Sequence, residues 1–212
     1  MKDLFEGLRP SVEHVAEGIV LFPQHVDTVP LLAEIDKIAK QSPFRHMQTP
    51  GGRRMSVAMT NCGRYGWTSG KSGYQYSSTD PLSGAQWPSL PASFQSLAHS
   101  AAAKAGFNDF IPDSCLINWY EPGTKLTPHQ DRDEADMRWP IVSVSLGISA
   151  MFQFFGNERG GQAKNLLLQD GDVLVWGGRA RLYYHGVKKL EKATDDRIGA
   201  LRYNLTFRKA IG

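Results

Sequence analysis

Cysteine is scarce in this 212-residue chain, which contains only Cys62 and Cys115. The two lie far apart and belong to no CxxC or Cys/His pattern, which argues against a disulfide scaffold and favours a reducing compartment. Long apolar runs are also missing. No stretch reaches the roughly 18 apolar residues of a membrane span, and the N-terminus has no apolar run long enough for a signal peptide. We therefore expect a cytoplasmic protein with no membrane partner.

Acidic residues are absent from one long segment. No Asp or Glu occurs between Gln41 and Thr79, although the whole chain carries a net charge of only +3. The same segment contains six glycines and the basic and aromatic residues Arg45, Arg53, Arg54, Arg64, Lys71, Phe44, Tyr65, Trp67, Tyr74 and Tyr76. Basic side chains interleaved with aromatic ones suit a phosphate backbone and stacked bases, which indicates a nucleic-acid surface. The alternative is an ordinary solvated surface rich in loops.

Chain length and hydrophobic patterning indicate a single domain, residues 1–212, with a sizeable core. Apolar stripes predict helices over about residues 28–41 and 91–105. After Pro112 the pattern changes to short strands separated by turn signals, which favours a β-sandwich or barrel. The predicted strands are 114–120, 141–147, 150–155, 164–168, 172–176, 181–187 and 200–208.

Two histidines and one carboxylate in the C-terminal half form a candidate metal site. His129 and Asp131 are two residues apart, so on an extended segment both side chains point the same way. His185 lies in a β-rich run that can bring it alongside from another strand. Such a set can hold a divalent iron on one face and leave the other coordination positions open. The alternatives are loop polar groups beside a buried, satisfied histidine, or a zinc-dependent hydrolase.

The last predicted strand has one polar face and one apolar face. Every second residue from Arg202 to Arg208 is polar, and the residues between them are apolar. Two arginines on an inward face need anionic partners, and a guanidinium suits planar recognition of a carboxylate. Asn118 and Tyr120 likewise share one face of strand 114–120. The strand therefore indicates a clamp for a small dicarboxylate, and the alternative is a solvent-facing edge strand.

With these motifs in hand, the chain resembles the AlkB family of iron(II)- and 2-oxoglutarate-dependent dioxygenases, in particular its bacterial DNA-repair members. The HxD pair, the distant histidine and the RxNxTxR strand carry the resemblance, which extends over nearly the whole chain. Further matching segments are Ser42–Arg45, Met55–Gly63, Gly66–Trp67, Ile141–Gly147 and Trp176–Gly178.

The resemblance implies an α+β, mainly β fold. A double-stranded β-helix, or jelly roll, would occupy about residues 112–212, with N-terminal helices and a nucleotide-recognition lid over about residues 41–80. The implied iron ligands are His129, Asp131 and His185. The implied 2-oxoglutarate pocket comprises Asn118, Tyr120, Arg202, Asn204 and Arg208. Trp67, Tyr74, Asp133 and Arg159 occupy the positions that handle the methylated base and its flanking phosphates.

The activity implied by the resemblance is oxidative demethylation. With iron(II), and with 2-oxoglutarate and oxygen as cosubstrates, the enzyme would demethylate 1-methyladenine and 3-methylcytosine and release formaldehyde, succinate and CO2. The target base has to be single-stranded or flipped out of a duplex, because a stacked base cannot meet the iron. We expect alkylated DNA as the partner, with RNA as a further candidate, and a monomeric enzyme.

Two alternatives to this activity remain besides the zinc-dependent hydrolase. An RNA or protein demethylase can use the same iron centre, and a nucleic-acid-binding module can retain the fold without catalysis. The basic pair Arg53-Arg54 departs from the family pattern and leaves the lid contacts open. Asp133 could favour the cationic methylated bases, or it could form a solvated acidic loop with Glu134 and Asp136.

Overall fold

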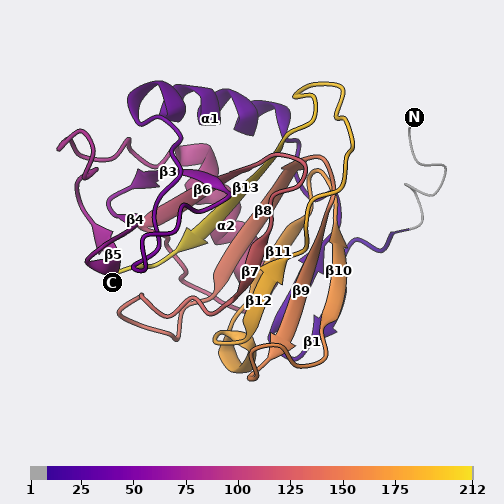
Figure 1. Ribbon diagram of the computed structural model, residues 1–212. Coiled ribbons are helices and arrows are strands. Elements are labelled where there is room, and N and C mark those ends of the chain that lie inside the picture. The colour runs from indigo at the N-terminus through magenta and orange to yellow at the C-terminus, as the bar shows by residue number, and fades with distance from the viewer. Residues whose placement is uncertain (1–8, 212) are drawn as a thin grey trace.

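Strands dominate the computed structural model, which describes residues 9–211 (Figure 1). Two α-helices, α1 (Val29–Gln41) and α2 (Ala92–Lys104), lie within that range, so the predicted mainly β composition with two helices is confirmed. Neither helix in the described part of the chain is long and apolar enough to cross a membrane. The first eight residues, on which the expected lack of a signal peptide partly rests, lie outside the described residues.

The strands form two main sheets and one hairpin. The larger sheet has the order β1 (Glu13–Ala16), β2 (Ile19–Phe22), β11 (Val173–Trp176), β8 (Ile141–Gly147), β13 (Arg202–Arg208), β6 (Ser114–Tyr120) and β3 (Ala58–Gly63). The smaller sheet has the order β10 (Lys164–Leu168), β9 (Ala150–Gly156), β12 (Tyr184–Val187) and β7 (Leu126–His129). β4 (Gly66–Gly70) and β5 (Gly73–Ser77) pair only with each other.

The larger sheet is covered on both faces, because its strands alternate between two apolar clusters. One cluster joins α1 and α2 to the sheet and includes Leu205 and Phe207 of β13. The other joins the larger sheet to the smaller one and includes Phe152 of β9 and Trp176 of β11. Each fully buried side chain of this size contributes about 1.5–3 kcal/mol. The helices therefore back the larger sheet on one side, and the smaller sheet faces its other side (Figure 1).

Patterning did not predict β1, β2, β7 or the β4–β5 hairpin. All four residues of β2 are buried, so its sequence has no alternation for a pattern to detect. The predicted strand 181–187 begins only at Tyr184, because a short 3-10 helix, η2 (Gly178–Ala180), is followed by a turn at residues 181–182. Cys62 and Cys115 are far apart in sequence but directly opposed across β3 and β6, where both are buried free thiols.

Phe94 tests the packing of α2 against β13. Its side chain is fully buried and meets Phe207 edge to face, with ring centroids 5.9 Å apart. Phe94→Ala should lower the free energy of unfolding by about 3–5 kcal/mol, because it leaves a cavity between helix and sheet. Gln95→Ala, at an exposed position of the same helix, should stay within about 0.5 kcal/mol. Urea denaturation measures both, and equal midpoints for the two variants would contradict this packing.

Candidate functional site

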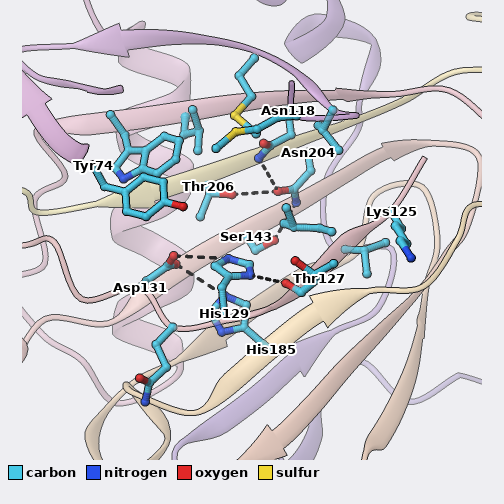
Figure 2. Close-up of a pocket in the computed structure, with 18 of the residues that line it drawn as sticks. Tyr74, Asn118, Lys125, Thr127, His129, Asp131, Ser143, His185, Asn204 and Thr206 are labelled. Atoms are coloured by element: carbon cyan, nitrogen blue, oxygen red, sulfur yellow. Dashed lines mark hydrogen bonds and ion pairs between the residues drawn. The ribbon is translucent and has the colours of Figure 1, made fainter. Parts of the chain in front are cut away.

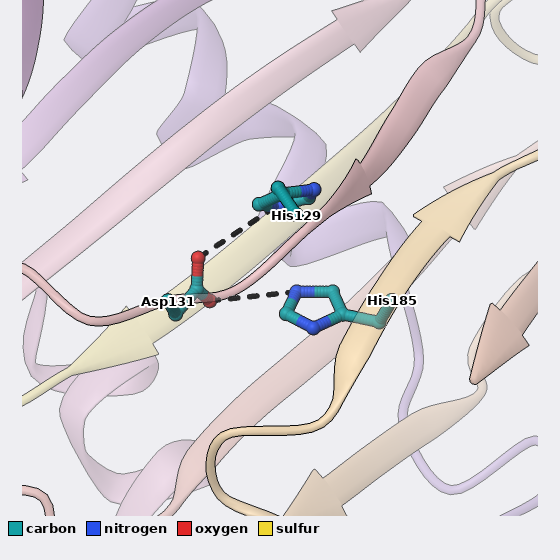
Figure 3. A group of neighbouring side chains, drawn as sticks. All are labelled: His129, Asp131 and His185. Carbon is teal, nitrogen blue, oxygen red and sulfur yellow. Dashed lines mark ion pairs between the residues drawn. The ribbon is translucent and has the colours of Figure 1, made fainter. Parts of the chain in front are cut away.

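His129, Asp131 and His185 meet between the smaller sheet and β13 (Figure 3). His129 ends β7 and lies opposite His185 of β12 in the strand register, and Asp131 follows β7 by two residues. The potential ligand atoms of the three side chains all lie within 4.8 Å of one another. Each histidine Nε2 is 3.7 Å from a carboxylate oxygen of Asp131. The predicted residues therefore come together in a group that can hold one metal ion.

Backbone carbonyls orient both imidazoles. The Nδ1 of His129 lies 3.0 Å from the carbonyl oxygen of Thr127, and the Nδ1 of His185 lies 2.9 Å from that of Tyr183. Because a carbonyl can only accept, Nδ1 carries the hydrogen and Nε2 presents its lone pair towards Asp131. Burial, followed by the neighbouring His129, lowers the pKa of His185 to about 4. A neutral imidazole is the form that binds a metal.

Arg208 holds the carboxylate of Asp131 from the other side. Its Nη2 and Nε lie 2.7 and 3.1 Å from Oδ2 of Asp131, and both side chains are at most 10% exposed. Burial alone would raise the pKa of Asp131, but Arg208 and then the two histidines hold that pKa well below its usual value. The carboxylate is therefore ionised and carries the negative charge that a divalent cation requires.

β13 presents its polar face to the interior. It pairs with β8 on one side and β6 on the other, so the alternative of a solvent-facing edge strand is wrong. Arg202 is 2% exposed and donates from Nη2 to Ser145 Oγ at 2.7 Å and from Nη1 to the Ile148 carbonyl at 3.2 Å. Burial lowers its pKa to about 10, so the guanidinium stays charged at neutral pH.

Six buried polar side-chain atoms lack hydrogen-bond partners among residues 9–211, and three of them belong to cavity-lining residues of β6 and β13. These three are Nε of Arg202, Nη1 of Arg208 and Oδ1 of Asn118. A buried donor or acceptor left unpaired costs roughly 1–3 kcal/mol. Two unpaired guanidinium nitrogens on one strand face match the oxygens of a small dicarboxylate, so the residues present fit such a ligand.

A single cavity of about 730 Å³ contains the triad and the polar face of β13. The histidines and Asp131 lie across it from Asn118 and Asn204 (Figure 2). The cavity is lined by all of the predicted site residues: Trp67, Tyr74, Asn118, Tyr120, His129, Asp131, Asp133, Arg159, His185, Arg202, Asn204 and Arg208. Its volume lies within the usual range for small-molecule sites, about 300–1,000 Å³.

Aromatic and basic side chains line the same cavity as the triad. Trp67 of β4 and Tyr74 of β5 stack with ring centroids 5.5 Å apart and an interplanar angle of 16°. The indole Nε1 of Trp67 donates to Asp133 Oδ2 at 2.8 Å. The cavity also includes the exposed cations Arg53 and Arg54. The cavity can therefore accept a planar group together with negative charge.

The alternative of a solvated acidic loop is wrong for Glu134, which sequence reasoning missed as part of the site. Its side chain is 2% exposed and pairs with Arg181 Nη2 at 2.8 Å. Asp133 is exposed, and Asp136 is paired with Arg138 at the surface. A lone Glu in an acidic run gives no sequence signal for burial, because its partners come from distant segments.

Asp131→Ala tests the metal site. Removing the only carboxylate of the triad should abolish the binding of one equivalent of Co2+, followed by its visible absorption. Asp133→Ala removes a carboxylate two residues away that lies outside the triad, and it should bind Co2+ like the parent protein. Equal Co2+ affinity in the Asp131→Ala variant and the parent would exclude Asp131 as a ligand.

Comparisons with known proteins agree over most of the chain. Residues 18–208 match the model of the 2OG-Fe(II) oxygenase superfamily. The chain is 51% identical to the alpha-ketoglutarate-dependent dioxygenase AlkB of Escherichia coli (strain K12), over 99% of this chain and 98% of that protein. It is 38% identical to the AlkB homolog of Caulobacter vibrioides (strain NA1000 / CB15N), over 92% and 89% of the two chains.

A solved structure gives the same result in three dimensions. The structure of OsALKBH1 matches with a TM-score of 0.82 and 30% identity, covering 93% of this chain and 99% of that one. The model match assigns the chain to the superfamily, and 51% identity to AlkB over nearly the whole length assigns it to the AlkB family. The protein belongs to the AlkB family of alpha-ketoglutarate-dependent dioxygenases, within the 2OG-Fe(II) oxygenase superfamily.

Proposed function

We propose that this dioxygenase repairs alkylated nucleic acid by oxidative demethylation of 1-methyladenine and 3-methylcytosine, releasing formaldehyde, succinate and CO2. One observation carries the proposal: a single cavity contains the His-Asp-His group, the free guanidinium nitrogens and a stacked aromatic pair. Those three parts correspond to a metal, a dicarboxylate cosubstrate and a planar base. The near full-length similarity to AlkB supports the same reaction.

We infer a single catalytic domain over residues 1–212, in which the strands of the two main sheets from about residues 112–212 form the double-stranded β-helix and β1, β2 and β3 extend the larger sheet. The lid of about residues 41–80 includes the β4–β5 hairpin and the loop that contains Arg53 and Arg54. Within that segment β3 pairs with β6 of the larger sheet, which attaches the lid to the core.

Iron(II) is proposed to bind His129, Asp131 and His185. Bound there with 2-oxoglutarate, it would supply the oxygen activation that oxidises the methyl group. The chain's own residues set the conditions for this chemistry: two carbonyl-oriented imidazoles present Nε2, and Arg208 keeps the carboxylate ionised. A zinc hydrolase is the weaker alternative, because hydrolysis has no use for the buried guanidiniums of β13.

2-Oxoglutarate is proposed to lie between Arg202 and Arg208, with one carboxylate at each. Asn118, Tyr120 and Asn204 would line its chain, and their side chains share the cavity. Arg202 is the better anchor, because none of the hydrogen bonds it makes among residues 9–211 goes to a carboxylate. Arg208 already binds Asp131, so it would contribute its free Nη1.

The substrate is proposed to enter as a single strand or as a base flipped out of a duplex. The base would reach the cavity beside Trp67 and Tyr74, with Asp133 next to its cationic ring. Arg159 would hold a flanking phosphate, and Arg53 and Arg54 would add positive charge on the lid. We propose alkylated DNA as the first substrate. Alkylated RNA is the second candidate, because neither the aromatic pair nor the cations distinguish the two sugars. We also propose a monomer in the cytoplasm, a location that the two free thiols support.

The reaction is tested by loading the protein with iron(II) and 2-oxoglutarate without oxygen, then adding oxygen and a single-stranded oligonucleotide containing 1-methyladenine. Formaldehyde and succinate should appear in equal amounts, and the unmethylated oligonucleotide should yield no formaldehyde. The same sequence made as RNA ranks the two nucleic acids by kcat/KM. Succinate without formaldehyde on either methylated strand would contradict nucleic-acid demethylation and favour a protein substrate.

Arg202→Ala should weaken 2-oxoglutarate binding by roughly 10- to 150-fold, because hydrogen bonds to a charged group contribute about 1.5–3 kcal/mol. Calorimetric titration of the Co2+-loaded protein measures the dissociation constant. Lys125→Ala is the matched control, because Lys125 is a cation of the same cavity outside the β13 face. Equal losses in both variants would indicate a diffuse positive field in place of a specific clamp.

Asp133→Ala should lower kcat/KM for the cationic bases 1-methyladenine and 3-methylcytosine more than for neutral 1-methylguanine. A carboxylate beside a cationic ring makes a charge-assisted contact that a neutral base lacks. Since Asp133 also accepts the Trp67 indole hydrogen, Trp67→Phe is the control: it removes that hydrogen bond and leaves the charge. If both variants reduce all three activities equally, Asp133 supports Trp67 and does not select for charge.

A further inference from the structure

Glu134 is a buried carboxylate with three partners from distant segments. Tyr76 of β5 donates its hydroxyl to Oε1 at 2.7 Å, and Arg181 donates from Nη2 to Oε2 at 2.8 Å. The Nε of Arg208 lies 3.4 Å from the same Oε1. Burial raises the pKa of Tyr76, so the phenol keeps its hydrogen and acts as a donor. Both oxygens of this carboxylate therefore have partners inside the protein.

The Arg208 guanidinium is shared between two carboxylates. It binds Oδ2 of Asp131 at 2.7 Å and faces Glu134 at 3.4 Å. Arg181 supports the same segment, because its Nη1 donates to the backbone carbonyl of Asp131 at 2.6 Å. Two cations and two anions thus balance in a region where an unpaired charge is strongly unfavourable. Loss of the Glu134 charge would free Arg208 to shift further onto Asp131.

The β4–β5 hairpin donates hydrogen bonds to two adjacent residues of the segment that follows β7. Trp67 of β4 donates to Asp133, and Tyr76 of β5 donates to Glu134. Trp67 and Tyr76 are opposite each other in the hairpin register, and Tyr74 lies two residues before Tyr76 on the same strand. The stacked Trp67–Tyr74 pair is therefore joined through Tyr76, Glu134 and Arg208 to the carboxylate of the metal group.

We propose that Glu134 is a positioning residue that joins the aromatic hairpin to the Arg208–Asp131 ion pair. This inference rests on the proposed function and deepens it. A base seated against Trp67 and Tyr74 would fix the hairpin, and Glu134 would transmit that restraint to Asp131. Consumption of 2-oxoglutarate would thereby be tied to the presence of a methylated base. If Glu134 had only a structural role, its loss would destabilise the fold and leave unchanged the dependence of 2-oxoglutarate consumption on a methylated base.

Two conservative variants and one control separate these roles. Glu134→Gln keeps the shape but removes the charge that holds Arg208. Tyr76→Phe removes only the hydroxyl that joins the hairpin to Glu134. Asp136→Asn is the matched control, because Asp136 belongs to the same acidic run but pairs with Arg138 at the surface. Two readouts apply: the visible spectrum of bound Co2+, and the formaldehyde formed per succinate on single-stranded DNA containing 1-methyladenine.

Tyr76→Phe should keep the parent's Co2+ spectrum without nucleic acid and lower the formaldehyde-to-succinate ratio by roughly 2- to 10-fold, the lower part of the range for side chains coupled in one network. Glu134→Gln should alter the Co2+ spectrum and lower the ratio by a similar factor. Asp136→Asn should change neither. The proposal is overturned if Tyr76→Phe retains the parent's ratio, or if Asp136→Asn loses it equally. Should Glu134→Gln fail to fold, the ratio for Tyr76→Phe decides.

Failure of this inference differs from failure of the proposed function. The parent protein is assayed beside the variants, so absent formaldehyde from the parent would reject demethylation itself. If the parent is active and the variants form as much formaldehyde per succinate as the parent, only the role of Glu134 is rejected. The Co2+ spectrum of Glu134→Gln tests the effect of Glu134 on the metal group separately, because it requires no turnover.

Discussion

A buried ion pair, Arg208 against Asp131, is the interaction on which the site depends. Such a pair inside a β core is weak evidence for stability, because removing two charges from water offsets much of their attraction. Here the pair matters because it fixes the position of the Asp131 carboxylate. Arg208 keeps Asp131 ionised and fixed where two histidines can share a cation with it. The larger sheet contributes Arg208 and the smaller sheet contributes His185 to Asp131. The β4–β5 hairpin contributes indirectly, because its Tyr76 binds Glu134, which faces Arg208.

The two-residue period of β13 connects this chemistry to the fold. One face of the strand packs Leu205 and Phe207 against the helices, and the other directs Arg202 and Arg208 into the cavity. A shift of one residue in register would exchange these faces and bury the cations in the apolar layer. Pairing with β6 and β8 on both sides fixes that register. The seven residues of β13 therefore contribute to both the core and the anion site.

The sequence could predict those parts of the site that lie on one strand or two residues apart. The HxD pair and the alternating strand follow from backbone geometry alone, and both arrangements occur in the structure. The Glu134 group could not be predicted, because Tyr76 and Arg181 are 58 and 47 residues away from it in sequence. Strands β2 and β7 also lacked a signal, since the first is buried throughout and the second is only four residues long.

The triad and the β13 cations are expected to hold iron(II) and 2-oxoglutarate side by side. Anaerobic titration of the iron(II)-loaded protein with 2-oxoglutarate, followed by visible absorption, tests this arrangement most directly. A keto acid that chelates the iron produces a charge-transfer band, whereas succinate lacks the keto oxygen and cannot chelate in that way. The side-by-side arrangement predicts a band that saturates at one equivalent of 2-oxoglutarate and is absent with succinate. Bound iron with no band at saturating 2-oxoglutarate would contradict it.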